Sequence, residues 1–150
     1  MTTPLLVDDL MRDEGLRLAA YPDPLSGGDP WTIGYGHTGA DVTAATVWTR
    51  SEAADTLIED IAIAQSELDE KLPWWRTLDD VRQDAMVEMA FNLGVEGLLG
   101  FRRTLAAIEV GQWAAASADM LLSAWAGEVG ARAARLAAMM RTGARGTPAP

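Results

Sequence analysis

The sequence predicts a mostly helical α+β fold, in which a small and partly extended lobe is followed by a long helix and a helical lobe. Prolines and glycines cluster between Pro22 and Gly39, around the aromatic and β-branched run "WTIGYGH", and this pattern favours a hairpin or a small sheet. Beyond residue 50, apolar residues recur at helical spacing between polar ones, which is typical of amphipathic helices.

Length and composition bound the domain organisation. The chain has 150 residues, of which 49% are apolar, and this is enough for one domain with a sizeable core. We therefore expect a single domain over residues 1–150, with a small lobe over about residues 12–60, a helical lobe over about 61–143 and a frayed tail over 144–150.

The individual helices are predicted from capping residues and from glycine or proline stops. Ser51 is expected to cap a helix that runs to Leu72 and stops at Pro73. Its 22 residues would span about 33 Å, long enough to connect two lobes. The other helices are expected over Pro4–Arg12, from Thr77 to a stop at Gly94, and over Arg102–Glu109, Gln112–Glu128 and Ala131–Arg141.

The residue types present exclude several kinds of site. The chain has no cysteine and one histidine, which rules out a disulfide framework, a cysteine nucleophile and a thiolate zinc site, and leaves a zinc hydrolase short of imidazole ligands. We expect no metal and no cofactor. The net charge of −10 argues against nucleic acid as a partner, although residues 101–150 are locally basic, with 6 arginines against 3 acids.

The amino-terminal segment "MTTPLLVDDLMRDEG" lacks the basic start and the long apolar run of a signal peptide, and no later apolar run approaches the roughly 18 residues of a membrane span. We therefore expect no signal peptide, no signal anchor and no membrane insertion, and a chain that is made and folded in a cytoplasm.

Carboxylates and hydroxyls are the reactive groups that remain for a groove between two lobes. Glu14, beside apolar Leu10 and Leu16, is suited to stay protonated as a general acid, whereas Asp23 lies in a proline-rich and more hydrated loop. Two such carboxylates are what glycoside hydrolysis needs, and the Thr32 hydroxyl could hold the attacking water. The ordinary alternative is that Glu14 is a solvated helix-end residue and Asp23 a turn former.

These residues lie in a pattern that resembles the phage-type lysozymes of glycoside hydrolase family 24. "DEGLRLAAY" is followed by an aspartate two residues after the tyrosine and then by "TIGYGH", and "LDDVRQDAMVEMAFNLGVEGLLGF", "GQW" and "ARAARLAAMMRTG" are similar to the family's later helices, in order. The resemblance covers roughly residues 5–143. It implies a two-lobed lysozyme fold in which Glu14, Asp23 and Thr32 form the active site.

The segment after Asp23 departs from the family pattern. "PLSGGDPW" separates Asp23 from Thr32 and is longer than the family's usual spacing, and it adds Asp29 as a rival carboxylate. We expect Asp23 to be the second carboxylate, because "YPD" keeps the spacing from Glu14, with Asp29 as the alternative.

The resemblance also implies roles for residues outside the catalytic set. His37 matches a histidine held by an aspartate of the long helix, here Asp60, which makes this a structural pair. Arg132 matches an arginine that pairs with the catalytic glutamate. Glycan-contact positions are matched by Thr38, Phe91, Asn92, Thr104 and Asp119. Among the tryptophans, we assign Trp113 and Trp125 to the core and only Trp31 to the neighbourhood of substrate.

The implied function is that of an endolysin-type muramidase, which cuts the β-1,4 bond between N-acetylmuramic acid and N-acetylglucosamine in peptidoglycan. The expected enzyme is a monomer in the cytoplasm of a host bacterium that reaches the wall through a separate holin-type protein. The alternative is a lysozyme fold kept as a glycan-binding or protein-interaction module with weak or lost catalysis.

Overall fold

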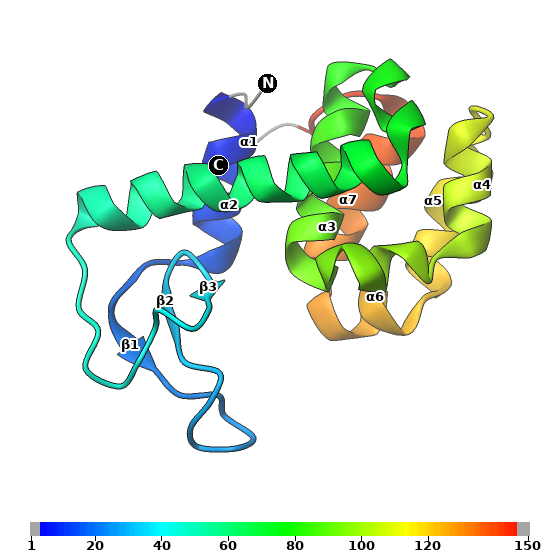
Figure 1. Ribbon diagram of the computed structural model, residues 1–150. Helices are drawn as coiled ribbons and strands as arrows, with labels where there is room; N and C mark the ends of the chain where they lie inside the picture. The colour runs from blue at the N-terminus through cyan, green and yellow to red at the C-terminus, as the bar shows by residue number, and fades with distance from the viewer. Residues whose placement is uncertain (1–3, 147–150) are drawn as a thin grey trace. The chain divides into compact units, whose positions relative to one another are not determined.

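The computed structural model describes residues 4–146 and is mostly helical with one small sheet, which confirms the predicted α+β class (Figure 1). Its contacts divide the chain into two compact units, Met1–Ile63 and Ala64–Pro150. The long helix α2 (Arg50–Lys71) contributes residues to both units. Among the described residues, no helix is long and apolar enough to cross a membrane.

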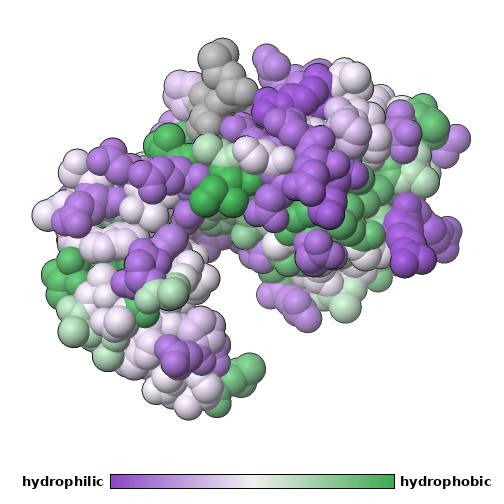
Figure 2. Space-filling model, viewed as in Figure 1, coloured by the Kyte–Doolittle hydropathy of each residue, from purple (hydrophilic) through white to green (hydrophobic). Residues whose placement is uncertain are grey.

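The first unit contains helix α1, a three-stranded antiparallel sheet and the first part of α2. Helix α1 covers Pro4–Glu14, and the strands are β1 (Arg17–Tyr21), β2 (Thr32–Gly34) and β3 (His37–Thr38), in the order β1-β2-β3. The loop between β1 and β2 extends away from the sheet, and a hydrophobic residue is visible at its end (Figures 1 and 2). This loop contains Leu25, which is 97% exposed.

A small core holds the first unit together. On α1, Leu6 and Leu10 lie one helical turn apart and are both buried, as the helical period requires for one apolar face. The core residues of this unit, almost all aliphatic, are Leu6, Leu10, Ile33, Val42, Ala53, Leu57 and Ile61.

Helix α2 begins one residue earlier than the sequence predicts, and Ser51 is not its cap. The backbone N–H of Glu52 donates to Thr49 Oγ1 at 3.1 Å, and the N–H of Thr49 donates to Glu52 Oε1 at 3.1 Å. This reciprocal pair is a capping box. The prediction that Ser51 is the cap was wrong. Serine and threonine are both good caps, and Thr49 is the cap here because Glu52, three residues later, completes the capping box.

The second unit is helical. Besides the end of α2 it contains a 3-10 helix, η1 (Pro73–Thr77), and the helices α3 (Asp80–Leu99), α4 (Arg102–Glu109), α5 (Trp113–Leu122), α6 (Ala124–Val129) and α7 (Ala131–Thr142). Large buried side chains of its core include Leu68, Trp75, Met86, Met89, Leu98, Ile108, Met120, Leu136 and Met140.

Several predicted helix ends differ from the structure: α1 runs to Glu14 rather than Arg12, and α3 begins at Asp80 rather than Thr77. Two larger differences lie inside predicted helices or at their predicted stops. Gly94, at φ 73° and ψ 155°, interrupts α3 as a kink, but helical turns resume to Leu99 because Val95 and Leu98 are buried there. The single helix predicted over Gln112–Glu128 is two helices, since Ser123 is extended and its hydroxyl accepts a hydrogen bond from the N–H of Ala126 at 3.2 Å.

The prediction for the tryptophans is right for one and wrong for the other. Trp125 is buried, at 4% exposure. Trp113 is only half-buried, and its ring lies under the guanidinium of Arg82, whose Cζ is 3.9 Å from the ring centroid. The cation–π contact explains why this indole stays at the surface.

Ion pairs connect α3 to the end of the chain. The buried carboxylate of Glu88, 1% exposed, accepts from both terminal nitrogens of Arg135, at 2.8 and 3.3 Å. Arg145 bonds to the buried Asp84. Residues 147–150, the rest of the predicted tail, lie outside the described residues.

Candidate active site

Glu14 is the last residue of α1 and is half-buried. Gly15, at φ +70°, turns the chain out of the helix toward β1. The carboxylate of Glu14 lies against the backbone of Gly36, because a β-carbon built on Gly36 would stand only 2.6 Å from Glu14 Oε2. The turn between β2 and β3 therefore restricts the positions that the Glu14 carboxylate can take on that side.

Asp23 organises the loop between β1 and β2. Its Oδ2 accepts hydrogen bonds from the backbone N–H groups of Leu25 at 3.1 Å and Ser26 at 3.0 Å. Its own backbone N–H donates to the carbonyl of Gly28 at 2.9 Å and its carbonyl accepts from the N–H of Gly27 at 2.8 Å. Such side-chain turns are common for aspartate. They hold the carboxylate in one orientation and leave Oδ1 without a hydrogen bond among the described residues.

Asp29, the rival carboxylate, is exposed and contributes to the loop only through its backbone. Its carbonyl accepts from Ser26 Oγ at 2.8 Å. No hydrogen bond to its side chain is found among the described residues. The loop thus orients the carboxylate of Asp23 but not that of Asp29.

Thr32 is the first residue of β2, the strand between the Asp23 loop and the Gly36 turn. It is directly opposite Tyr21 on β1 and Thr38 on β3. Side chains at directly opposed positions of a sheet share one face, so the sheet brings Thr32 and the predicted glycan contact Thr38 together.

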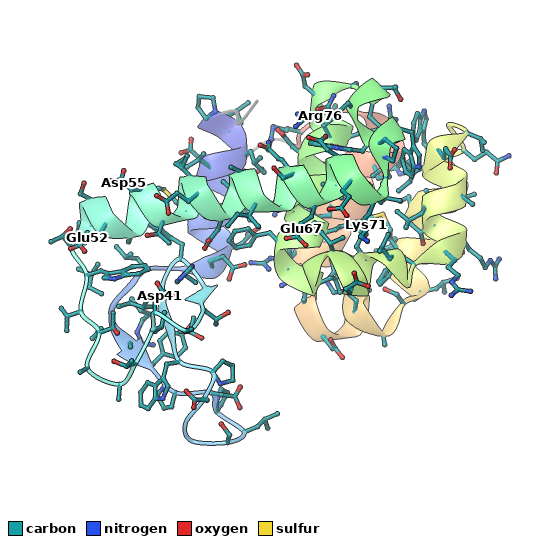
Figure 3. The ribbon with its side chains drawn as sticks, in the orientation of Figure 1. Asp41, Glu52, Asp55, Glu67, Lys71 and Arg76 are labelled. Carbon is teal, nitrogen blue, oxygen red and sulfur yellow. The ribbon has the colours of Figure 1, made fainter. Side chains whose placement is uncertain are left out.

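The histidine lies between two carboxylates. His37 Nδ1 is 2.7 Å from Asp60 Oδ2, and Nε2 is 3.2 Å from both carboxylate oxygens of Asp41. Asp41 lies in the loop after β3 and is labelled in Figure 3. Its ring also packs on Trp48, with centroids 5.4 Å apart. Burial alone would lower the pKa of the imidazole, but hydrogen bonds and charge from Asp60 and then Asp41 outweigh burial and raise it. Both ring nitrogens are occupied, so this imidazole is poorly placed to act as a base.

The other predicted contact residues belong to the second unit. Phe91 and Asn92 are half-buried on α3 before the kink, and Arg132 is half-buried at the start of α7. Asn92 Oδ1 accepts a hydrogen bond from the indole Nε1 of Trp125 at 2.7 Å. The side-chain oxygen of Asn92 therefore supports the core, and its amide nitrogen is the group left for a ligand.

Thr104 and Asp119 line one pocket of about 370 Å³ in the second unit. Thr104 is buried, at 3% exposure, and Asp119 is half-buried on α5. The same pocket is lined by Arg102 and Arg103, which the sequence analysis did not single out as contacts.

Two further residues, Asp41 and Gly36, were missed by the sequence analysis. The structure reveals the role of Asp41, whose carboxylate contacts the second ring nitrogen of His37. Its position four residues after His37 was the available sequence signal for this contact. Gly36 is part of the recognised motif, but its contact with Glu14 is not visible in the sequence. Arg102 was noted only as local charge. Among the described residues no group of three His, Asp or Glu side chains could hold a metal ion.

Comparison with known proteins places the chain in a family. The family model "Phage lysozyme" matches residues 11–141. The chain belongs to the phage lysozyme family. This family of glycoside hydrolases is the one that the sequence pattern indicated, and the matched range contains Glu14, Asp23, Thr32 and every other predicted site residue.

Relatives of the phage lysozyme family differ in how much of their length this chain covers. It is 32% identical to the pre-baseplate central spike protein Gp5 of Enterobacteria phage T4, over 92% of this chain and 28% of that protein. It is 26% identical to the probable T4-type lysozyme 1 of Dictyostelium discoideum, over 91% and 93%. It is 34% identical to the endolysin of Bacillus phage PZA, over 67% and 41%.

Proposed function

We propose that this chain is a muramidase that hydrolyses the β-1,4 bond between N-acetylmuramic acid and N-acetylglucosamine in bacterial peptidoglycan, in the manner of an endolysin. The family membership supports a glycoside hydrolase. The observation that carries the proposal is the position of the Glu14 carboxylate against the Gly36 turn, since a general acid needs a fixed carboxyl group at the end of a rigid element.

In this proposal, Glu14 donates a proton to the oxygen of the leaving sugar. Asp23, held by the N–H groups of Leu25 and Ser26, is the second carboxylate, which glycoside hydrolysis needs as base or nucleophile. Thr32, at the start of β2, which connects the Asp23 loop to the Gly36 turn, positions the water. These three residues belong to the same unit of the chain.

Most of the proposed contacts to the glycan come from residues of the second unit. The resemblance to the family assigns this role to Phe91, Asn92, Thr104 and Asp119, and Arg132 is proposed as a further substrate-binding residue. Thr38 is the glycan contact of the first unit, and its position opposite Thr32 on the sheet supports this role. His37 and Asp60 act only in holding the first unit together, and their short hydrogen bond supports that role.

The proposed enzyme acts as a monomer without a cofactor. Its partners are the glycan strands of the wall, and its access to the wall depends on a separate holin-type protein. A chain with net charge −10 is repelled by an anionic wall at long range, so substrate contacts have to come from local groups.

The chemistry of the products tests this function. Purified peptidoglycan incubated with the full chain should release new reducing ends and no new amines. New amines would indicate an amidase or peptidase. Binding to the walls without either product would support the glycan-binding module and contradict the muramidase.

A further inference from the structure

The loop that carries Asp23 keeps its shape without a hydrophobic anchor. None of residues 22–32 is buried, and the side chain of Leu25 is 97% exposed. The loop extends away from the sheet between β1 and β2 (Figure 1). A segment with so few buried apolar contacts depends on its hydrogen bonds for a defined conformation. These hydrogen bonds therefore decide where the carboxylate of Asp23 lies.

The hydroxyl of Ser26 makes two hydrogen bonds inside this loop. Its Oγ donates to the backbone carbonyl of Asp29 at 2.8 Å and accepts from the backbone N–H of Gly28 at 3.2 Å. The side chain of Ser26 is exposed, yet its hydroxyl bonds to the chain on both sides of the turn. It thereby connects the turn after Asp23 to the part of the loop that leads into β2.

The backbone of Ser26 holds Asp23 as well. The N–H of Ser26 donates to Asp23 Oδ2 at 3.0 Å. Gly28, which the Ser26 hydroxyl binds, accepts from the backbone N–H of Asp23 at 2.9 Å through its carbonyl oxygen. These bonds form a closed ring: the Ser26 hydroxyl holds Gly28, Gly28 holds the backbone of Asp23, and the Ser26 N–H holds the carboxylate.

The ring fixes one oxygen of the Asp23 carboxylate and leaves the other for chemistry. Oδ2 accepts from the N–H groups of Leu25 and Ser26, whereas Oδ1 has no hydrogen bond among the described residues. A reacting group has to be held in one geometry to be effective, and the residues around it supply that geometry. The direction of Oδ1 thus depends on how firmly the loop is closed.

We propose that Ser26 is a positioning residue, whose hydroxyl closes the loop and so orients the carboxylate of Asp23 for the hydrolytic step. This inference rests on the proposed function, in which Asp23 is the second carboxylate. Ser26 acts through Asp23 and does not touch the substrate. It lies in "PLSGGDPW", the segment that is longer than the usual spacing of the family, so the arrangement is a feature of this chain.

Ser26→Ala on the full chain tests the proposal, because it removes the hydroxyl and keeps the N–H that binds Asp23. With soluble glycan strands of peptidoglycan as substrate, kcat for reducing-end formation should fall about fivefold, the effect of losing about one hydrogen bond, while KM stays level. Ser26→Thr keeps the hydroxyl, and the exposed position has room for its methyl group. This variant should restore kcat.

Ser51→Ala is the matched control. Ser51 is exposed on α2, and its hydroxyl makes no hydrogen bond with the described part of the chain, so the same substitution there should change neither kcat nor KM. A lower melting temperature of Ser26→Ala with an unchanged kcat would show that the hydroxyl only stabilises a turn, and would overturn the proposal. A loss of kcat that Ser26→Thr does not restore would overturn it too.

The amide proton of Leu25 reports on the arrangement independently of activity. Its N–H donates to Asp23 Oδ2 at 3.1 Å, so its NMR shift should follow the protonation of that carboxylate in the unmodified protein. The amplitude of this pH-dependent shift should decrease in Ser26→Ala and stay the same in Ser51→Ala. An amplitude that Ser26→Ala leaves unchanged would contradict a role of the hydroxyl in orienting Asp23.

The two measurements separate this proposal from the function on which it rests. A decreased Leu25 amplitude in Ser26→Ala, without new reducing ends from the unmodified protein, would reject the muramidase and keep the role of Ser26 in orienting Asp23. New reducing ends, with the amplitude and kcat of Ser26→Ala both unchanged, would keep the muramidase and reject the positioning role.

Discussion

The backbone of Gly36 lies against the carboxylate of Glu14, so closely that a β-carbon at Gly36 would be 2.6 Å from Glu14 Oε2 and 3.2 Å from Cδ. Gly36 also has φ +77°, a conformation that other residues adopt at a cost. Gly36 is therefore needed for two separate reasons: its backbone has a positive φ, and a side chain at this position would occupy the space of the proposed general acid.

Gly36→Ala is expected to reduce wall hydrolysis more than tenfold, because the new methyl group displaces the Glu14 carboxylate. Gly27→Ala is the matched control, since Gly27 has φ +71° but nothing within 4 Å of its β-carbon position. Both variants should lose about 1 kcal/mol of stability from backbone strain. Equal activity of the two variants at a temperature where both are folded would show that the contact does not matter.

The loop geometry predicts different effects for its two aspartates. Asp23→Asn keeps an oxygen that can accept from Leu25 and Ser26 but removes the charge, so it should lose most activity with little change in melting temperature. Asp29→Asn, whose side chain is exposed, should keep activity close to that of the unmodified chain. Reducing-end assays on the two variants decide the matter, and the reverse order would show that Asp29 is the second carboxylate.

The position of His37 predicts a pH-dependent contribution to stability. Its pKa is raised in the folded protein because the bonds and charges of Asp60 and Asp41 outweigh burial. A raised histidine pKa gives stability that is fully present below the unfolded value of about 6.5 and is lost as pH rises through the folded pKa.

His37→Asn should therefore lower the free energy of unfolding by about 2 kcal/mol at pH 5, the scale of a hydrogen bond to a charged group, and by much less at pH 9. Denaturant unfolding at the two pH values measures this. Asp41→Asn, which removes the more exposed partner, should bring the NMR-detected pKa of His37 part of the way down. An imidazole that titrates at its reference value in the unmodified protein would contradict the paired arrangement.

Much of the local structure was predictable from the sequence, because it depends on neighbours in the chain. The sheet around "TIGYGH", the long helix and the break at Gly94 follow from residue types close together. The continuation of α3 to Leu99 was not predictable, since it depends on burial of Leu98 in the second unit. The split at Ser123 was missed because one serine in an alanine-rich stretch competes weakly with helix propensity.

For the candidate site too, some features were predictable from the sequence and others depend on how distant segments pack. The resemblance named Glu14 and the pair of His37 and Asp60 at their positions, but it could not supply the contact of Gly36 with Glu14, which joins a helix end to a turn. Nor could it find the pocket around Arg102, because a pocket depends on where α5 packs against α4.

The excess of acidic side chains predicts how wall hydrolysis responds to salt. A chain at −10 is repelled by an anionic wall, and the range of this repulsion shrinks from about 30 Å at 0.01 M salt to about 10 Å at 0.1 M. Hydrolysis should therefore rise modestly with salt and level off near physiological strength. A steady fall from the lowest salt would show that local arginines outweigh the net charge.

The acids of α2 allow this prediction to be tested by mutation. Asp55 and Glu67 are exposed on α2 (Figure 3), and no hydrogen bond or ion pair to them is found among the described residues. Asp69 is unsuitable, because its Oδ1 accepts from Trp75 Nε1 and Arg76 Nε, each at 2.8 Å. Asp55→Lys with Glu67→Lys should flatten the salt dependence without lowering the melting temperature.

The central claim is that the carboxyl group of Glu14 donates the proton that releases the glycan. Glu14→Gln keeps the size of the side chain and removes the acid, so the rate of reducing-end formation from purified walls should fall at least a hundredfold, while the melting temperature stays level or rises. That rate, measured beside the melting curve, is the most direct test. A folded Glu14→Gln protein that keeps more than a tenth of the original rate would remove Glu14 from the mechanism and contradict the account.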